Sequence, residues 1–183
     1  MQKATARTAL IFMFKIFRYC PSCGKQLEKS KIPKLIDCGN CGFHYYINIY
    51  PTVAAILENK RGQILLVERK NPPKKGYWDL PGGFLEFNEN LENALIRELK
   101  EELGVNLRGL SYIGSATDLY PYKGITYNIV VAVYKGTIGD KIYPADDVAS
   151  FKFVDKKNYN KNEFAFPGLS KIIEGYIRND PGS

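Results

Sequence analysis

The sequence predicts an α/β domain preceded by a small cysteine-rich module. Runs rich in Val, Ile, Tyr and Phe alternate with two stretches of helical pattern, and all four cysteines fall in two C-x2-C pairs near the N-terminus. The length of 183 residues accommodates one ordinary domain and one small module, and 45% hydrophobic content is typical of a globular protein. No segment approaches the roughly 20 apolar residues of a membrane span.

A helix is predicted over residues 91–103, where Leu, Ala, Glu and Lys dominate and Gly and Pro are absent. Asn90 is a suitable N-cap, and Gly104 is a suitable C-terminal stop. At about 100° per residue, one arc of this helix collects apolar positions that should face a core: Leu95, Ile96, Leu99 and Leu103. The neighbouring arc collects three carboxylates at i, i+3 and i+4: Glu98, Glu101 and Glu102.

These three carboxylates repel one another and lie toward the partially negative end of the helix. A glutamate-rich helix face is commonly a solvated surface. Here, however, the acids border the apolar arc, and a Pro81-Gly82-Gly83 turn, through which backbone can approach a ligand closely, precedes the helix. Mg²⁺ combines a few carboxylates with water and substrate phosphate oxygens. The pattern therefore predicts a Mg²⁺ or Mn²⁺ site for a phosphate-bearing substrate.

The same stretch carries a longer pattern of constrained positions. It reads Gly83-x5-Glu89-x7-Arg97-Glu98-Leu99-x-Glu101-Glu102-x-Gly104-Val105. This pattern resembles the signature of the Nudix hydrolases at every constrained position. Asn88, where the family often has glycine, is a mild departure because asparagine tolerates a left-handed backbone. The resemblance implies an α/β/α sandwich with a mixed sheet, and an enzyme that cleaves the pyrophosphate bond of a nucleoside diphosphate linked to another group.

The resemblance also implies roles for individual side chains in metal binding and catalysis. Glu98, Glu101 and Glu102 match the family's metal-binding carboxylates. The carbonyl of Gly82 is expected as a further ligand, and Glu98 is the preferred candidate for orienting or deprotonating water. Alternative candidates for the base lie in later loops: Asp146, Asp147 and Glu163.

Three further residues of this stretch are expected to support the site. Arg97 matches the arginine that pairs with Glu89 and holds the geometry between the loop and the helix. Glu86 falls at the acidic position after the two glycines, where it is expected near the outer shell of the metal.

The cysteines predict a structural zinc site. Both pairs are C-x2-C followed by glycine, and four thiolates form a closed tetrahedral set: Cys20, Cys23, Cys38 and Cys41. The alternative, two disulfides in a secreted protein, is less favoured because each pair is too close to bridge internally and no export signal is evident. His44 would be a redundant fifth ligand. Reduced cysteines are consistent with a cytoplasmic protein.

The predicted organisation has four parts. Residues 1–15 are an extension without fixed structure, 16–48 the zinc ribbon, 49–178 the Nudix domain and 179–183 a tail. Residues 1–50 carry eight Lys/Arg against two Asp/Glu. The ribbon is nevertheless expected to pack against the catalytic domain or to support a homodimer, with nucleic-acid binding the less favoured alternative. In the family, such a ribbon resembles that of NADH pyrophosphatases.

The remaining segments supply strands, a second helix and weaker candidates for substrate contacts. Strands are predicted over 52–57, 63–68, 110–116, 126–134 and 151–154, and a helix over 171–177. Arg69 begins a basic loop that could meet an anionic substrate. Tyr120 and Tyr122 lie in a turn predicted over 118–124 and are candidates for stacking on an adenine.

The substrate class is the least determined prediction. The Ser-Gln-Pro-Trp-type motif of NADH pyrophosphatases is missing after the signature of residues 83–105, which we call the box. Pro121 instead resembles ADP-ribose pyrophosphatases, and the adjacent tyrosines resemble dinucleoside polyphosphate hydrolases. ADP-ribose or an adenine dinucleotide such as NAD(H) is therefore predicted first, and a nucleoside triphosphate second. A non-enzymatic nucleotide sensor is the rival from another class, but the presence of all box carboxylates favours an enzyme.

Overall fold

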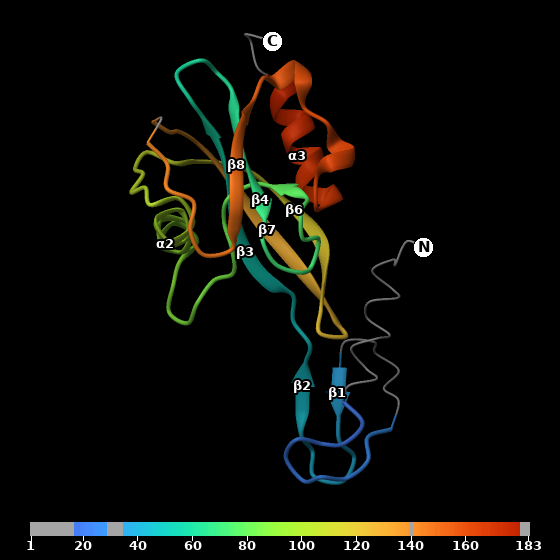
Figure 1. Cartoon of the computed structure of the whole chain (residues 1–183). Helices are drawn as coiled ribbons and strands as arrows, with labels where there is room; N and C mark the ends of the chain where they lie inside the picture. Colours follow the sequence, from blue (N-terminus) through green and yellow to red (C-terminus); the bar gives the residue numbers. More distant parts are fainter. Residues whose placement is uncertain (1–16, 29–34, 140, 180–183) are drawn as a thin grey trace. The chain divides into compact units, whose positions relative to one another are not determined.

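The computed structural model describes residues 17–28, 35–139 and 141–179 (Figure 1). The predicted extension over residues 1–15 lies outside the described residues, as do residues 180–183 of the predicted tail. Two compact units are present: residues 1–50 together with 119–128, and residues 51–118 together with 129–183. None of the helices in the described ranges combines the length and apolar character that a membrane crossing needs.

A six-stranded mixed sheet forms the centre of the α/β fold. Its strands are β3 Tyr50–Glu58, β4 Ile64–Arg69, β5 Trp78–Asp79, β6 Ser111–Tyr122, β7 Ile125–Thr137 and β8 Val148–Val154. They are ordered β5-β4-β3-β7-β6, and β8 pairs antiparallel with β4. Strands β3 and β4 form an antiparallel hairpin, where the sequence predicted two successive strands. Asn59 stabilises its turn because its side-chain oxygen accepts hydrogen bonds from the backbone N–H groups of Arg61 and Gln63.

Two α-helices cover opposite faces of this sheet (Figure 1): α2 Leu91–Leu103 and α3 Pro167–Arg178. Two short 3-10 helices, Lys156–Asn158 and Lys161–Glu163, precede α3. Alternate residues of β3 and β4 join α2 in one hydrophobic core, and the intervening residues of these strands are buried too. The strands are therefore covered on both faces, which explains why they read as nearly continuous apolar runs.

Leu95, Leu99 and Leu103 of α2 are fully buried in that core, as predicted. Truncating any one of them to alanine should cost about 2–5 kcal/mol of folding stability. Ile96 is a correction, because it is partly exposed and Ala94 takes the buried position instead. The helix is thus turned slightly about its own axis relative to the prediction.

The structure also corrects two predicted boundaries. Residues 118–122 belong to strand β6 and not to a turn, because the reversal needs only Lys123 and Gly124, both with positive φ. Helix α3 begins at Pro167, four residues before the predicted start at Lys171. Proline is tolerated in the first helical turn, and the carboxylate of Asp118 on β6 accepts hydrogen bonds from the Gly168 and Leu169 N–H groups. Such a distant cap is invisible to local sequence patterns.

The N-terminal unit contains a two-stranded antiparallel sheet, β1 Leu35–Asp37 and β2 His44–Tyr46. Its small core is formed by Ile36 and Ile47, against which three partly buried side chains pack: Phe17, Leu27 and Phe43. A core of this size cannot support much structure alone, so a further stabilising element is expected in this unit.

Candidate active site and cysteine cluster

The ends of α2 are defined by its caps. Asn90 has an extended backbone, and its side chain accepts a hydrogen bond from the Asn93 N–H at 2.8 Å. Gly104 adopts the left-handed conformation with φ 69°, and its N–H bonds back to the last turn. The predicted helix is therefore confirmed at both ends, and its acidic arc is held in a defined rotation by the buried leucines.

The Pro81-Gly82-Gly83 turn lies against strand β3. The Val53 N–H donates to the Gly83 carbonyl at 2.9 Å, and the Ala55 N–H donates to the Pro81 carbonyl at 3.0 Å. Gly82 has φ 142°, and a Cβ there would overlap the Val53 carbonyl oxygen. A Cβ on Gly83 would overlap the carboxylate of Glu98. Only glycines allow this close approach of turn, strand and acid.

The three box glutamates of α2 differ in their surroundings. Glu102 is 7% exposed and accepts a hydrogen bond from the Gly82 N–H at 2.9 Å. Burial raises the pKa of Glu102 well above its usual value, although the Gly82 N–H opposes this shift. Burial also raises the pKa of Glu98, against the effect of Arg97. Glu101 is exposed. Burial therefore makes two of the three carboxylates costly to keep charged, and for Glu98 the adjacent Arg97 offsets only part of that cost.

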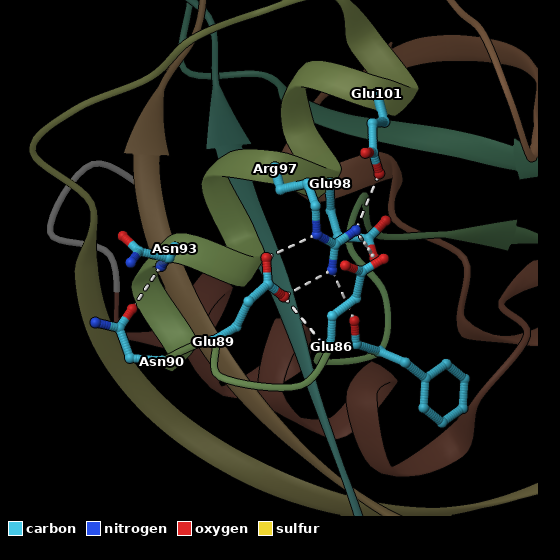
Figure 2. Close-up of polar contacts among 8 residues, drawn as sticks. Glu86, Glu89, Asn90, Asn93, Arg97, Glu98 and Glu101 are labelled. Atoms are coloured by element: carbon cyan, nitrogen blue, oxygen red, sulfur yellow. Dashed lines mark hydrogen bonds and ion pairs between the residues drawn. The ribbon is translucent and has the colours of Figure 1, made fainter.

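Arg97 lies at the centre of this acidic group (Figure 2). Its guanidinium donates to both carboxylate oxygens of Glu89, to Glu98 and Glu101 at 2.9 Å each, and to the Phe84 carbonyl at 2.9 Å. The Arg97–Glu89 pair expected from the sequence is therefore present, and the contacts to Glu98 and Glu101 are additional. Arg97 ties the loop after the glycines to the helix that carries the acids.

The loop leading into α2 is ordered by the same pair. The Glu89 carboxylate accepts from the Glu86 N–H at 3.0 Å, while the Glu86 residue itself is exposed. Asn88 has φ 65°, so the position where the family often has glycine does adopt the left-handed conformation. Glu86 thus reaches the site through its backbone; a contact of its side chain with a metal stays a prediction.

The acidic oxygens are not gathered into a closed cage. Among the described residues, only the four cysteines form a group of three or more ligand atoms that all lie within 4.8 Å of one another. Glu98 and Glu101 are drawn to Arg97, whereas Glu102 is drawn to Gly82. Carboxylate oxygens are nevertheless the donors that Mg²⁺ and Mn²⁺ prefer, so the residues present fit a hard divalent cation.

A later loop reaches the C-terminal end of α2. The Tyr143 and Ala145 N–H groups donate to the Leu103 and Glu102 carbonyls, both at 2.9 Å. Asp146, with φ 48°, contributes to the raised pKa of Glu98, and Asp147 contributes to that of Glu102. The structure thus brings the loop that carries two of the alternative base candidates to the end of α2 that bears Glu102.

Glu163, the third alternative for the base, is engaged elsewhere. Its carboxylate pairs with Lys152 at 3.3 Å and accepts from the Asn160 side chain at 2.9 Å. Through these contacts Glu163 stabilises the segment that leads into α3.

A small cleft, partly open to solvent, adjoins the glycine turn. It is lined mainly by apolar side chains together with a few polar ones: Thr52, Val53, Ala54, Arg69, Asp79, Leu80, Gly82, Gly83, Phe84, Asp118, Ile129, Val131, Phe166 and Leu169. Gly82 and Gly83 therefore line the cleft and also contact the box acids. Small-molecule sites commonly combine such apolar walls with a few placed polar groups.

Arg69 and Asp79 form a largely buried ion pair in the wall of the cleft. Arg69 donates to Asp79 at 3.0 Å and to the Pro73 carbonyl at 2.8 Å, and its guanidinium lies 5.2 Å from the centre of the Phe166 ring. Burial raises the pKa of Asp79 to about 6 even though Arg69 lowers it. Arg69 was predicted to lie near substrate, but Asp79 and Phe166 were missed. An acid between the apolar residues Trp78 and Leu80 was the available signal for Asp79.

Tyr120 and Tyr122 lie at the end of β6, within the stretch that groups with the N-terminal unit. Their rings are 6.4 Å apart, and Tyr122 is 40% exposed. Their contact with a substrate adenine stays a prediction.

The four cysteines converge on one point and are not joined in disulfides. The Sγ atoms of Cys20 and Cys41 are 3.7 Å apart, as are those of Cys23 and Cys38. A tetrahedron of thiolates at the usual zinc–sulfur distance has edges of about 3.8 Å. The geometry is therefore compatible with a zinc ribbon. His44 is not part of the cluster; its Nδ1 lies 3.8 Å from Asp37.

The two turns that carry these cysteines have the same backbone hydrogen bonds. The Gly24 N–H donates to the Cys20 carbonyl at 2.9 Å, and the Gly42 N–H donates to the Cys38 carbonyl at 2.9 Å. Both glycines are left-handed, with φ 72° and 73°. The repeated turn explains why each C-x2-C pair is followed by glycine.

Comparison with known sequences identifies the family. The profile of the NUDIX domain matches residues 49–174. This chain belongs to the Nudix family. The predictions of a Nudix fold with a mixed sheet and of an enzyme of the nucleotide pyrophosphatase class are thereby confirmed, and members of this family generally use Mg²⁺ or Mn²⁺.

Two kinds of relative are similar to this Nudix chain over most of its catalytic part. An ADP-ribose pyrophosphatase from Methanocaldococcus jannaschii is 38% identical over 138 residues, which cover 73% of this chain and 78% of the relative. An NAD-capped RNA hydrolase, NudC, from Pseudomonas aeruginosa is 27% identical over 71% of this chain. The aligned part spans only 44% of the length of that NudC protein.

Solved Nudix structures share the fold. A NUDIX hydrolase from Nitrosomonas europaea superposes with a TM-score of 0.69 at 21% identity, covering 91% of this chain and 94% of the other. The NUDIX domain of Shewanella oneidensis NrtR, solved with ADP ribose, superposes with a TM-score of 0.57 at 25% identity, covering 73% and 90%.

Proposed function

We propose that this Nudix protein hydrolyses the pyrophosphate bond of ADP-ribose or of a closely related adenine dinucleotide. The observation that carries the proposal is that the cleft and the acidic edge of α2 share Gly82 and Gly83. A nucleoside held in the cleft would extend its pyrophosphate across these glycines toward Glu98 and Glu102. ADP-ribose and the NAD cap, named for the two kinds of relative, both contain adenosine diphosphate joined to a second ribose.

In the proposed mechanism, the glutamates bind the metal and one of them serves the attacking water. Glu98, Glu101 and Glu102 would hold Mg²⁺ or Mn²⁺, with the Gly82 carbonyl as a further ligand; the ion supplies charge neutralisation on the phosphate oxygens. Glu98 orients the water and accepts its proton. Arg97 would hold the loop and the helix in place. Its hydrogen bonds to the Glu98 and Glu101 oxygens would break where those oxygens bind the metal.

Two aspartates in the loop next to α2 are alternatives to Glu98 as the general base. Asp146 and Asp147 lie close enough to the box acids to influence the pKa values of Glu98 and Glu102. We keep Glu98 as the base because its carboxylate lies directly over Gly83, where the scissile group is expected. Glu163 is set aside, because its own ion pair and hydrogen bond hold it in another segment.

Substrate binding is assigned to the cleft. Phe84 is 37% exposed at the glycine turn and offers a ring face to a nucleobase, while Arg69 offers a cation to a phosphate or a ribose hydroxyl. Asp79 holds Arg69 in place through their ion pair. The sequence-based candidates Tyr120 and Tyr122 are retained as a second, independent proposal for base stacking.

The test incubates the purified protein with Mg²⁺ and ADP-ribose and identifies the products. Hydrolysis of the pyrophosphate bond should yield AMP and ribose 5-phosphate. The variant Glu98→Gln should lower kcat by about a hundredfold or more, as expected for loss of a general base. Glu163→Gln is the matched control and should leave kcat unchanged. Wild-type turnover retained in Glu98→Gln would remove Glu98 from the mechanism. Hydrolysis confined to nucleoside triphosphates would replace the proposed substrate.

We propose that the cysteine cluster holds one structural Zn²⁺, as the sulfur spacing and the paired turns support. With residues 16–48 as the zinc ribbon and 49–178 as the Nudix domain, the proposal retains the predicted boundaries. Thiolate ligation favours a reducing compartment, so we retain the cytoplasm as the location. A homodimer also stays a prediction.

A further inference from the structure

The cleft beside the glycine turn contains a second carboxylate to which the proposed function gives no role. Asp118 on β6 lines this cleft together with the ion pair of Arg69 and Asp79. The Asp118 carboxylate accepts hydrogen bonds from the Gly168 and Leu169 N–H groups of α3, both at 2.9 Å. Each of its two oxygens is bonded to one N–H group, so the carboxylate has a fixed position in the wall of the cleft.

Asp118 occupies the place at the start of α3 where an anion could bind. The first N–H groups of a helix carry partial positive charge and commonly bind a ligand's phosphate. In α3, Pro167 has no N–H, and the Ser170 N–H donates to the Phe166 carbonyl at 3.0 Å. The two donors between them bond to Asp118, and a Cβ on Gly168 would overlap that carboxylate. Among the described residues of this helix end, no N–H group is left for a substrate phosphate.

The charges that line the cleft do not balance. Among the described residues, Arg69 is the one basic side chain of the lining, and it pairs with Asp79 at 3.0 Å. Asp118 adds a second acid, which contributes to the raised pKa of Asp79 after the larger effect of burial. Burial also raises the pKa of Asp118, whereas the two helix N–H groups and the charge of Lys171 lower it. With both acids ionised, two negative side chains and one positive side chain leave the lining negative.

An ionised carboxylate can accept hydrogen bonds but cannot donate them. A carboxylate has about four acceptor sites, and the two helix N–H groups use two of those on Asp118. The remaining sites suit a hydroxyl or amino group of a nucleoside. A phosphate beside the same oxygens would instead be repelled, because the charge of Arg69 is already balanced by Asp79.

We propose that Asp118 is a specificity-determining residue, which accepts a nucleoside with free ribose hydroxyls and excludes one whose ribose carries a further phosphate. ADP-ribose and unphosphorylated adenine dinucleotides are then preferred over their counterparts with a 2′-phosphate or 3′-phosphate on the adenosine. This inference rests on the proposed function, which places the nucleoside of the substrate in the cleft.

The test measures binding of AMP, adenosine 2′,5′-bisphosphate and adenosine 3′,5′-bisphosphate to the full chain with Mg²⁺ by isothermal titration calorimetry. A pH of about 8 keeps carboxylates ionised. The wild type should bind AMP about tenfold or more tightly than either bisphosphate, because like charges placed side by side weaken binding.

Two neutral variants separate the charge of Asp118 from its role as a helix cap. Asp118→Asn and Asp118→Ser both keep an oxygen that can accept from a helix N–H, so the ratio of the Kd values for bisphosphate and AMP should approach one. A role in capping alone would weaken binding of all three ligands alike and leave this ratio unchanged. Asp155→Asn, which changes an exposed aspartate outside the cleft, should keep the wild-type ratio. Thermal unfolding of each variant is measured alongside.

Three results would overturn the proposal: no binding of AMP by the wild type, equal or tighter binding of the bisphosphates, and an unchanged ratio in both neutral variants. Hydrolysis of ADP-ribose and of its 2′-phosphate is assayed in parallel. Equal kcat/KM for the two compounds would refute this inference and leave the proposed function standing. No hydrolysis of either compound, alongside a preference for AMP that depends on Asp118, would refute the proposed function and leave this inference standing.

Discussion

Arg97 and Glu89 form a bidentate ion pair, with Nε to Oε1 at 2.8 Å and Nη2 to Oε2 at 3.0 Å. The pair connects the loop after the two glycines to the middle of α2. The same guanidinium bonds to Glu98, Glu101 and the Phe84 carbonyl. One planar cation thus sets the distance between the backbone turn and the acidic face, which a point charge could not do.

Replacing Arg97 by lysine should misplace the carboxylates of Glu98 and Glu101 while keeping the positive charge at position 97. We expect the Mg²⁺ concentration needed for half-maximal activity to rise about 10- to 100-fold, as for other residues that orient metal ligands. The measurement is a metal titration of the initial rate of ADP-ribose hydrolysis, with Arg178→Lys on α3 as the control. An unchanged metal requirement in Arg97→Lys would show that the guanidinium does not position the ligands.

Gly83→Ala should impair catalysis more than stability. A Cβ there meets only the flexible Glu98 carboxylate, which can move away and leave the site. Gly82→Ala should instead lower the unfolding temperature strongly, because its Cβ meets the Val53 backbone and its φ of 142° is unfavourable for other residues. Gly175→Ala, in the open on α3, should stabilise the helix by about 1 kcal/mol. Thermal unfolding and kcat of the three variants check this ordering; full activity in Gly83→Ala would contradict it.

Metal analysis of the purified protein should find about one zinc per chain. Cys41→Ser should lower that content, because three thiolates hold zinc less tightly than four. A chelator should release the zinc of the wild type and melt the ribbon, observed as faster proteolysis of residues 17–50. Less than half an equivalent of zinc, together with intact disulfides, would refute the zinc ribbon.

Asp79 should make folding stability depend on pH. Burial raises the pKa of Asp79 from its ordinary value of 3.8 to about 6 in the folded protein, so the folded state binds a proton more tightly than the unfolded chain. This contribution is fully present below about pH 4 and is lost as the pH rises through 6. Relative to Asp79→Asn, the wild type should lose about 3 kcal/mol of unfolding free energy between about pH 3 and pH 7. Urea denaturation at about pH 3 and pH 7 measures this loss, and a difference between the two proteins that does not change with pH would show that the pKa of Asp79 is not raised in the folded protein.

Local sequence was sufficient for the elements whose causes are local. The two ends of α2 follow from Asn90 and Gly104, and the left-handed conformation of Asn88 follows from its side chain and its place in the box. The tight turn of each C-x2-C pair is local as well, because it needs only the glycine that follows the second cysteine. In these cases the interacting groups are separated by few residues, so their geometry hardly depends on the rest of the chain.

The fold class, the box and the cysteine pairs could therefore be predicted from residue order, since capping, periodicity and turn chemistry act between near neighbours. Contacts between residues far apart in the sequence depended on the path of the whole chain. Asp118 caps a helix 50 positions away, and the Asp147 carboxylate accepts a hydrogen bond from the Asn71 side chain. Tyrosines from β2 and the β6–β7 hairpin belong to one unit. Burial also raised the pKa values of Asp79 and Glu102. Desolvation of a carboxylate arises only once distant strands and helices have packed around it.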